Sequence, residues 1–376
     1  MAEVHGTFDE KFAGVRDVLS SNLDSGKDVG ASAAVSVEGE LVVDIWGGVI
    51  DDAGTPWERD TITNVWSTTK TMTNLSALIL ADQGLIDLDA PVATYWPEFA
   101  ANGKEGVLVR HLLAHTAGLA SWTHPMSEAD IYDWEIATSR LAEQAPMWEP
   151  GTASGYHALT QGYLVGEVIR RVTGQTIGQW FAKEVAGPLG ADFHIGTGPE
   201  HDHRCAPIIP PPENSLVNVD IPGDFAASLR NPALDPIWAT TIPWRRAEIP
   251  AAGGHGNARS VNRVQSVLAN GGQLDDVRLL SKAGCDRVFE VQSTGKDLVL
   301  GVPLTLGIGY GLNSEATPIG LNPNTCFWGG WGGSIVLIDT DAHVCITYVM
   351  NRMMGGTMGD DRGIGVAFAA YAALMG

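Results

Sequence analysis

A serine and a lysine stand three positions apart in the segment Ser67-Thr68-Thr69-Lys70. Residues at positions i and i+3 are neighbours on a helix surface, so the hydroxyl of Ser67 and the amine of Lys70 would face the same way. Serine is a weak nucleophile until a base takes its proton, and a lysine amine can supply or relay that base. A serine in the first helical turn also points its amide N–H outward, where it could hold a developing oxyanion. The pattern predicts nucleophilic catalysis by Ser67.

The same spacing occurs a second time, at residues 293–296, so the spacing alone is a weak signal. After Ser67, apolar residues follow helical spacing over positions 72–81, and Gly84 stands where a helix should end. A glycine interrupts the second copy, and no capped helix follows it. We therefore assign the chemistry to Ser67.

Composition excludes several classes of protein. The 376 residues are 44% hydrophobic, which is typical of a globular chain long enough for one large domain or two that share a core. Lysine and arginine number 23 against 44 acidic residues, a net charge of −21, which would repel nucleic acid and anionic membranes at long range. We expect neither as a partner. The sequence leaves the oligomeric state open.

Targeting and metal signals are also weak. Residues 1–10 lack the basic and apolar regions of a secretory signal, and no apolar run approaches the ~20 residues that span a bilayer. We expect a cytoplasmic location. The His201-Asp202-His203 segment has no paired ligand motif nearby, so we interpret it as a surface loop and predict no metal site. Four cysteines lack CxxC spacing and are expected to be core thiols: Cys205, Cys285, Cys326 and Cys345.

The first part of the chain mixes helix and strand signals. An amphipathic helix is predicted from Phe8 to Leu23, and the alternating segments 31–37 and 41–46 read as a β-hairpin. Residues 87–174 are helical and loop-rich without an obvious strand. Residues 201–250 are rich in proline and irregular, and such long stretches are usually functional.

The end of the chain returns to strands. A helix at 261–269 precedes them, and an Ala-rich helix closes the chain. The strand-like segments are 326–328, 334–339 and 344–349. Strands at both ends with helices between them predict an α/β (α+β) fold, in which one antiparallel sheet from both termini is flanked by helices and a mainly helical domain is inserted.

We assign the domains on this pattern. Residues 1–85 and 175–376 are expected to form the sheet domain, and residues 86–174 the helical domain. The active site is expected in the cleft between the two domains.

Three further segments make the first motif more specific. They are the run from Val109 to Leu119, the tyrosine segment Tyr156-His157-Ala158, and Trp328-Gly329-Gly330-Trp331-Gly332-Gly333-Ser334 leading into a strand. In this order they resemble the penicillin-recognising serine enzymes, meaning class C β-lactamases, DD-peptidases and their esterase relatives. The resemblance covers the chain from about residue 30 to the end. Its closest branch looks like the family VIII carboxylesterases, which share the β-lactamase fold.

The resemblance implies a role for each matched residue. Ser67 looks like the acylated nucleophile, Lys70 like its partner amine, and Tyr156 like the phenol that passes protons between the serine and the leaving group. The backbone N–H groups of Ser67 and Trp331 would form the oxyanion hole. A nearby cationic lysine favours a phenolate and burial opposes it, so either Lys70 or Tyr156 can be the first base.

Two departures from the family pattern bear on the substrate. β-Lactamases and DD-peptidases usually carry Lys or His, then Thr or Ser, then Gly at the third motif, where this chain has Trp328, Gly329 and Gly330. A substrate carboxylate would lose charge-assisted hydrogen bonds worth about 1.5 to 3 kcal/mol each. The usual Tyr-x-Asn likewise becomes Tyr156-His157-Ala158, without the amide. Trp-Gly-Gly is itself a feature of the family VIII esterases, so both departures favour neutral esters.

We therefore predict a serine carboxylesterase that needs no cofactor and acts on small-molecule esters. Substrate contacts are expected from Trp66, His157, Trp328, Gly329 and Gly330. The alternatives are a β-lactamase, DD-peptidase, amide hydrolase or acyltransferase on the same scaffold. A catalytically inactive binding protein is an alternative from another class, because a fold alone does not prove function.

Overall fold

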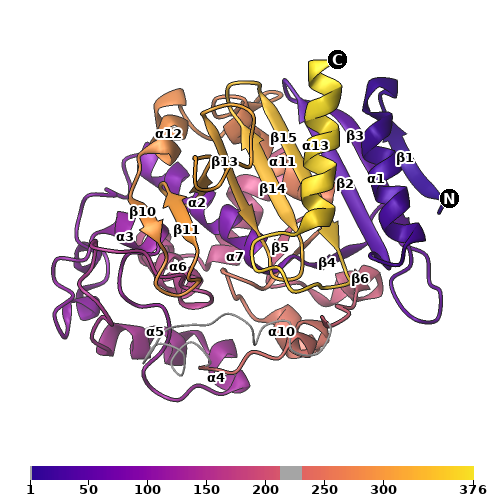
Figure 1. Cartoon of the computed structure of the whole chain (residues 1–376). Coiled ribbons are helices and arrows are strands. Elements are labelled where there is room, and N and C mark those ends of the chain that lie inside the picture. Colours follow the sequence, from indigo (N-terminus) through magenta and orange to yellow (C-terminus); the bar gives the residue numbers. More distant parts are fainter. Residues whose placement is uncertain (1, 212–230) are drawn as a thin grey trace.

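A nine-stranded sheet built from both ends of the chain forms the centre of the computed structural model, which describes residues 2–211 and 231–376 (Figure 1). Every neighbouring pair of strands in it is antiparallel, as predicted. The strand order across the sheet is β1 (Val4–Phe8), β3 (Glu40–Gly48), β2 (Gly30–Val37), β15 (Val344–Met350), β14 (Ile335–Asp339), β13 (Thr325–Gly329), β12 (Gly311–Leu312), β11 (Pro303–Leu306) and β10 (Ser293–Lys296).

The predicted β-hairpin is confirmed as β2 and β3. Its two-residue turn is Glu38-Gly39, and both residues have a positive φ, +51° and +86°. A turn of this conformation matches the right-handed twist of the two strands that it joins. β2 and β15 are almost wholly buried and lie side by side. A strand from the N-terminal part of the chain, β2, and the last strand, β15, therefore lie next to each other inside the sheet.

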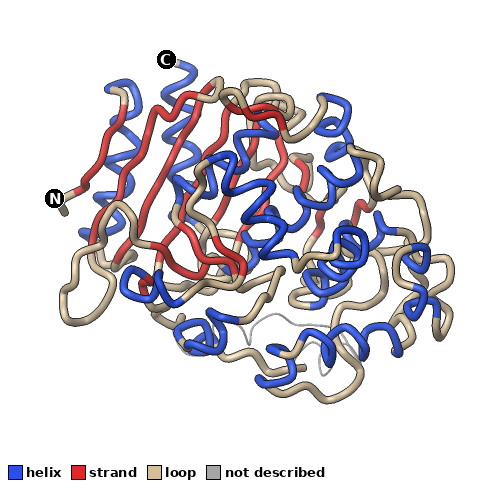
Figure 2. Tube along the Cα trace, turned by 180° about the vertical axis from the view of Figure 1, so that it is seen from behind, coloured by secondary structure: helices blue, strands red, loops and turns tan. Residues whose placement is uncertain are grey.

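Helices cover both faces of the sheet. α1 (Ala13–Asp24) and α13 (Asp361–Met375) pack together on one face (Figure 1). α11 (Ala258–Ala269) packs against β2, β14 and β15 on the other face, where the long helix α2 (Thr69–Asp82) also lies (Figure 2). The nucleophile segment is thus carried by a helix held inside the molecule.

The helix predicted from Phe8 to Leu23 is wrong at its start. Residues Val4–Phe8 form the edge strand β1 paired with β3, a 3-10 turn follows at Glu10–Phe12, and the helix begins at Ala13. The partner strand β3 lies elsewhere in the sequence, so the local pattern of apolar residues did not show that residues 4–8 pair with it. The short strands β10, β11 and β12 were missed for the same reason.

Residues 87–174 hold helices and loops, with a single isolated bridge between Pro91 and Leu108. The helical segments here are η3 (Val92–Thr94), η4 (Pro97–Ala100), α3 (Val109–Leu113), α4 (Glu128–Tyr132), α5 (Trp134–Glu143) and α6 (Thr160–Thr173). The division into 1–85 with 175–376 and 86–174 stays a prediction. Part of the proline-rich stretch at 201–250, residues 212–230, lies outside the described residues.

Shorter elements complete the described chain. A four-stranded sheet has the order β5 (His194–Ile195), β7 (Gly254–Gly256), β4 (Ile62–Asn64) and β6 (Cys205–Ala206), and β8 (Gln273–Leu274) pairs with β9 (Val277–Arg278). The other helical segments are η2 (Trp66–Thr68), α7 (Ile177–Phe181), the π-helix η5 (Ala182–Ala186), α8 (Gly187–Leu189), η6 (Pro199–Arg204), η7 (Pro236–Thr240), α10 (Ile242–Arg246), α12 (Lys282–Asp286) and η8 (Arg287–Phe289).

Among the described residues, neither the cysteines nor the His201 segment belongs to a group of three or more His, Cys, Asp or Glu side chains that could hold a metal ion. All four cysteines are free thiols; Cys285, Cys326 and Cys345 are buried, and Cys205 is half-buried. Asp202 is paired with Arg246 at 2.5 Å. Within residues 2–211 and 231–376, no helix is both long and apolar enough to cross a bilayer.

Candidate active site

Ser67 lies in the 3-10 turn η2, directly before α2. α2 is buried on every side from Thr69 to Leu80 and contacts α6, α7, α11 and α12, so it is a fixed support rather than a surface helix. The helix predicted after Ser67 is confirmed. The second segment with a serine and a lysine three positions apart, residues 293–296, forms β10. This strand lies at the edge of the nine-stranded sheet, and three of its four residues are exposed.

Trp66 has a strained backbone immediately before the nucleophile. Its φ is +50°, a region that bulky residues rarely adopt and that costs about 1 to 3 kcal/mol. The surrounding packing holds it there, because the Trp66 ring lies 4.8 Å from that of Trp331 and 5.4 Å from that of Trp244. The tryptophan contacts thus fix the path of the chain into Ser67.

The three predicted catalytic side chains converge. Lys70 Nζ is 3.1 Å from Ser67 Oγ and 3.1 Å from the Tyr156 hydroxyl, which in turn donates to Ser67 Oγ at 2.5 Å. Lys70 is fully buried, whereas Ser67 and Tyr156 each keep 7% of their surface exposed. A substrate can therefore reach the hydroxyls but not the amine.

Two backbone carbonyls orient the Lys70 amine. Nζ donates to Ala158 O at 2.8 Å and to Ala251 O at 3.0 Å. Burial lowers the pKa of Lys70 well below its usual 10.5. A neutral amine has two N–H donors and one lone pair, so when the carbonyls take both hydrogens the lone pair faces Ser67 and Tyr156. This arrangement makes Lys70 an acceptor for the serine proton.

A buried carboxylate missed from the sequence fixes the tyrosine. Asp297 Oδ1 accepts hydrogen bonds from the backbone N–H of Tyr156 at 3.0 Å and of Val299 and Leu300 at 2.9 Å. Burial raises the pKa of the Tyr156 phenol above 10.0, and the hydrogen bond with Ser67 opposes the rise. The phenol is therefore neutral in the resting site. No sequence signal marks Asp297, because it lies 141 positions from Tyr156.

His157 does not contact the cavity, which corrects the expectation that it binds substrate. Its ring is fully buried, Nδ1 contacts Gly155 O at 2.5 Å, and Nε2 accepts the Leu119 N–H at 2.9 Å. Burial lowers the pKa of His157 to about 4, so the ring is neutral. Its backbone N–H donates to Nδ1 of His115 at 3.1 Å. His157 thus joins the tyrosine loop to the segment 109–119.

The two predicted oxyanion amides lie on segments that touch. A Cβ at Gly330 would lie 2.3 Å from Val65 O, so only glycine lets the turn after β13 approach the nucleophile segment. Within residues 2–211 and 231–376, neither the Ser67 amide nor the Trp331 amide donates to another group. Both N–H groups are free to bind an oxyanion.

The other third-motif residues lie behind the site, which corrects their predicted substrate contacts. Trp328 is 1% exposed, stacks on His115 at 5.3 Å and lies 6.0 Å from the Tyr156 ring. A Cβ at Gly329 would lie 2.3 Å from the backbone of Met358. The missing side chains at Gly329 and Gly330 thus let neighbouring segments of the protein pack closely against this strand end. They do not make room for the substrate.

A cavity of about 560 Å³ opens beside Ser67 and Tyr156. Trp66 lines this cavity, and its contact with substrate stays a prediction. None of the described residues that line the cavity is a lysine or an arginine. Its further apolar walls include Ala120, Trp122, Leu159, Pro232, Leu234, Val299, Leu300 and Trp331. The segment 231–236 belongs to the proline-rich stretch 201–250 that was expected to be functional, whereas residues 299–300 were not assigned from sequence.

The site and fold are those of a known family. The sequence profile of the family described as Beta-lactamase matches residues 15–371, and the chain belongs to this family. The resemblance to penicillin-recognising serine enzymes is thereby confirmed.

Solved structures and a curated relative agree over nearly the whole chain. A structure described as a family VIII carboxylesterase has 41% identity and a TM-score of 0.91, covering 99% of this chain and 100% of that one. A penicillin-binding protein homologue from Caulobacter crescentus has 36% identity and a TM-score of 0.91, covering 99% and 100%. The esterase/beta-lactamase LipL of Mycobacterium tuberculosis is 36% identical over 93% of this chain and 83% of its own length.

Proposed function

We propose that this protein is a serine carboxylesterase that hydrolyses neutral small-molecule esters through an acyl-enzyme on Ser67. The convergence of Ser67, Lys70 and Tyr156 within 3.1 Å, beside an apolar cavity, carries the proposal. The names of the family VIII carboxylesterase structure and of LipL support an ester substrate.

Acylation begins with the serine proton. Ser67 Oγ attacks the ester carbonyl while its proton passes to the lone pair of Lys70, and the carbonyl oxygen becomes an oxyanion held by the amides of Ser67 and Trp331. When the intermediate collapses, the C–O bond to the alcohol breaks. Tyr156 gives its proton to the departing alcohol oxygen, and the Lys70 ammonium returns a proton to the phenol. The donor count at Nζ supports Lys70 as the first base.

Deacylation repeats these transfers with water. A water molecule loses a proton towards Tyr156 and Lys70 and attacks the acyl carbonyl. The second intermediate then releases the acid, and Ser67 Oγ recovers its proton. An alcohol in place of water would give acyl transfer by the same steps, so the acyltransferase alternative differs only in the acceptor.

The cavity walls support a neutral substrate. The described lining offers no guanidinium or ammonium to a carboxylate, and burying an unpaired charge there is costly. Residues of all three predicted chain segments contribute to it: Trp66 from 1–85, Trp122 from 86–174 and Trp331 from 175–376. This supports the proposed site between the sheet and helical domains. A cytoplasmic location stays a prediction.

Hydrolysis of p-nitrophenyl butyrate by the purified protein and by Ser67→Ala tests the proposal. The wild type should turn over the ester, and the variant should be inactive. Activity retained by Ser67→Ala contradicts it. Nitrocefin in the same series distinguishes a β-lactamase, whose turnover would match or exceed that of the ester. A protein inactive on every substrate and not labelled by a fluorophosphonate would be a binding protein.

A further inference from the structure

The turn that carries the Trp331 amide is tied directly to the nucleophile segment by one side chain. The turn runs from Gly330 to Ser334 and is closed by Gly330 N–H donating to Ser334 O at 2.8 Å. The Ser334 side chain is 1% exposed and points across to the chain before Ser67. Its hydroxyl donates to Val65 O at 2.8 Å.

A second hydroxyl completes the connection. Thr68 Oγ1 lies 2.9 Å from Ser334 Oγ. A serine hydroxyl has one hydrogen, and Ser334 uses it on Val65 O, so Thr68 is the donor of this bond. Val65 and Thr68 stand on either side of Trp66 and Ser67 in the chain. Ser334 therefore contacts both flanks of the residue whose amide is the other half of the oxyanion hole.

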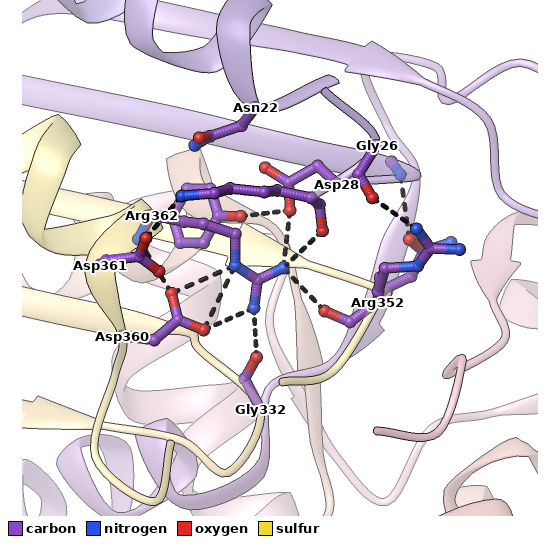
Figure 3. Close-up of polar contacts among 12 residues, drawn as sticks. Asn22, Gly26, Asp28, Gly332, Arg352, Asp360, Asp361 and Arg362 are labelled. Atoms are coloured by element: carbon purple, nitrogen blue, oxygen red, sulfur yellow. Dashed lines mark hydrogen bonds and ion pairs between the residues drawn. The ribbon is translucent and has the colours of Figure 1, made fainter. Parts of the chain in front are cut away.

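The outer side of the same turn is anchored by a buried arginine. Figure 3 shows Arg362 between Asp28, Asp360 and the turn, and its side chain has no exposed surface. Nη2 donates to Gly332 O at 2.5 Å and to Asp360 Oδ2 at 2.6 Å, and Nη1 donates to Asp28 Oδ1 at 2.8 Å. The peptide between Gly332 and Gly333, one residue beyond Trp331, is thus held from behind.

We propose that Ser334 and Thr68 are positioning residues that set the spacing of the two oxyanion amides, with Arg362 as the rigid backing of the turn. The close packing at Gly330, where a Cβ would lie 2.3 Å from both Ser334 Oγ and Val65 O, leaves the turn little room to move towards Ser67. The hydroxyl pair prevents movement the other way. The proposal rests on the esterase function, because an oxyanion forms only during acyl transfer.

Ser334→Ala and Thr68→Val remove the hydroxyls while nearly keeping the shape of the side chains. Each should lower kcat for p-nitrophenyl butyrate by about 10- to 100-fold, because a small misplacement of a catalytic donor has effects of that size. KM should stay within about twofold, since ground-state binding does not use the oxyanion. Thr68→Ser, which keeps the hydroxyl, should retain kcat.

A matched control and a second readout separate positioning from folding. Ser36→Ala removes an equally buried hydroxyl that bonds Ser266 at 2.6 Å between β2 and α11, and it should leave kcat unchanged. Affinity for a trifluoromethyl ketone, whose serine adduct carries an oxyanion, should fall in Ser334→Ala by the same factor as kcat. Wild-type turnover tests the esterase function separately. Unchanged kcat and unchanged ketone affinity in Ser334→Ala and Thr68→Val would overturn the proposal.

Discussion

Replacement of Tyr156 by phenylalanine separates the proton relay from the packing of the site. Tyr156→Phe removes the hydroxyl that donates to Ser67 Oγ at 2.5 Å and lies 3.1 Å from Lys70 Nζ. The ring contacts remain, with His115 at 5.2 Å and Trp328 at 6.0 Å. The leaving alcohol then lacks its proton donor, whereas the serine keeps Lys70 as its base.

The expected loss follows from these contacts. A positioned acid or base contributes about 10²- to 10⁴-fold, so kcat should fall by that factor, or about 3 to 5 kcal/mol in activation free energy. The free energy of unfolding should fall by only about 1 kcal/mol, because the lost hydroxyl donates one hydrogen bond, to Ser67 Oγ, and Lys70 keeps its two carbonyl partners.

Ester hydrolysis and thermal unfolding of the same samples measure both quantities. Tyr371→Phe is the matched control. Tyr371 lies on α13, away from the site, and the substitution removes a buried phenol oxygen that donates a hydrogen bond to Asp339 at 3.1 Å. It should keep full activity. A loss below tenfold in Tyr156→Phe would refute the proton relay through this phenol.

Three further results are expected. Because only the neutral amine accepts the serine proton, kcat/KM should fall as the pH drops through the lowered pKa of Lys70, giving an acidic limb well below pH 10.5. Asp28→Asn should lower the free energy of unfolding by about 3 kcal/mol or more, since it breaks a buried pair with Arg362. An ester whose acyl chain ends in a carboxylate should have a kcat/KM at least about tenfold below its neutral isostere, the factor for one lost charge-assisted bond.

Each of these has a clear contrary outcome. A pH–rate profile without an acidic limb would remove Lys70 as the base. Asp361→Asn is the control for Asp28→Asn: its pair with Lys27 is exposed, so it should cost under about 1 kcal/mol in a denaturant titration. Equal losses of unfolding free energy in Asp28→Asn and Asp361→Asn would contradict the claim that burial makes the Asp28–Arg362 pair the more important of the two. Equal rates for the charged and neutral esters would contradict the substrate class.

Local signals in the sequence were enough to predict the central elements. Helical spacing after Ser67 gave α2, and alternation gave the hairpin β2–β3 and the strands that return at the C-terminal end. These features depend on residues close together in the chain. The placement of Tyr156 against Ser67 followed from the family resemblance, because 89 positions separate them.

Side-chain direction and distant loops were not predictable in this way. Trp328 lies behind Tyr156, since the register of β13 in the sheet decides which way its ring points. His157 turns into the interior because its ring nitrogens meet backbone groups of other segments. Asp297 and the cavity wall at 231–236 reach the site only through the tertiary fold.

Trapping the acyl-enzyme tests the central claim most directly. The wild-type protein mixed with a slowly hydrolysed ester and quenched in acid should gain the mass of one acyl group, located by peptide mapping on the peptide that contains Ser67. Ser67→Ala should gain none. An acyl group on any other residue, or ester turnover without a covalent adduct under conditions that stabilise it, would contradict the mechanism.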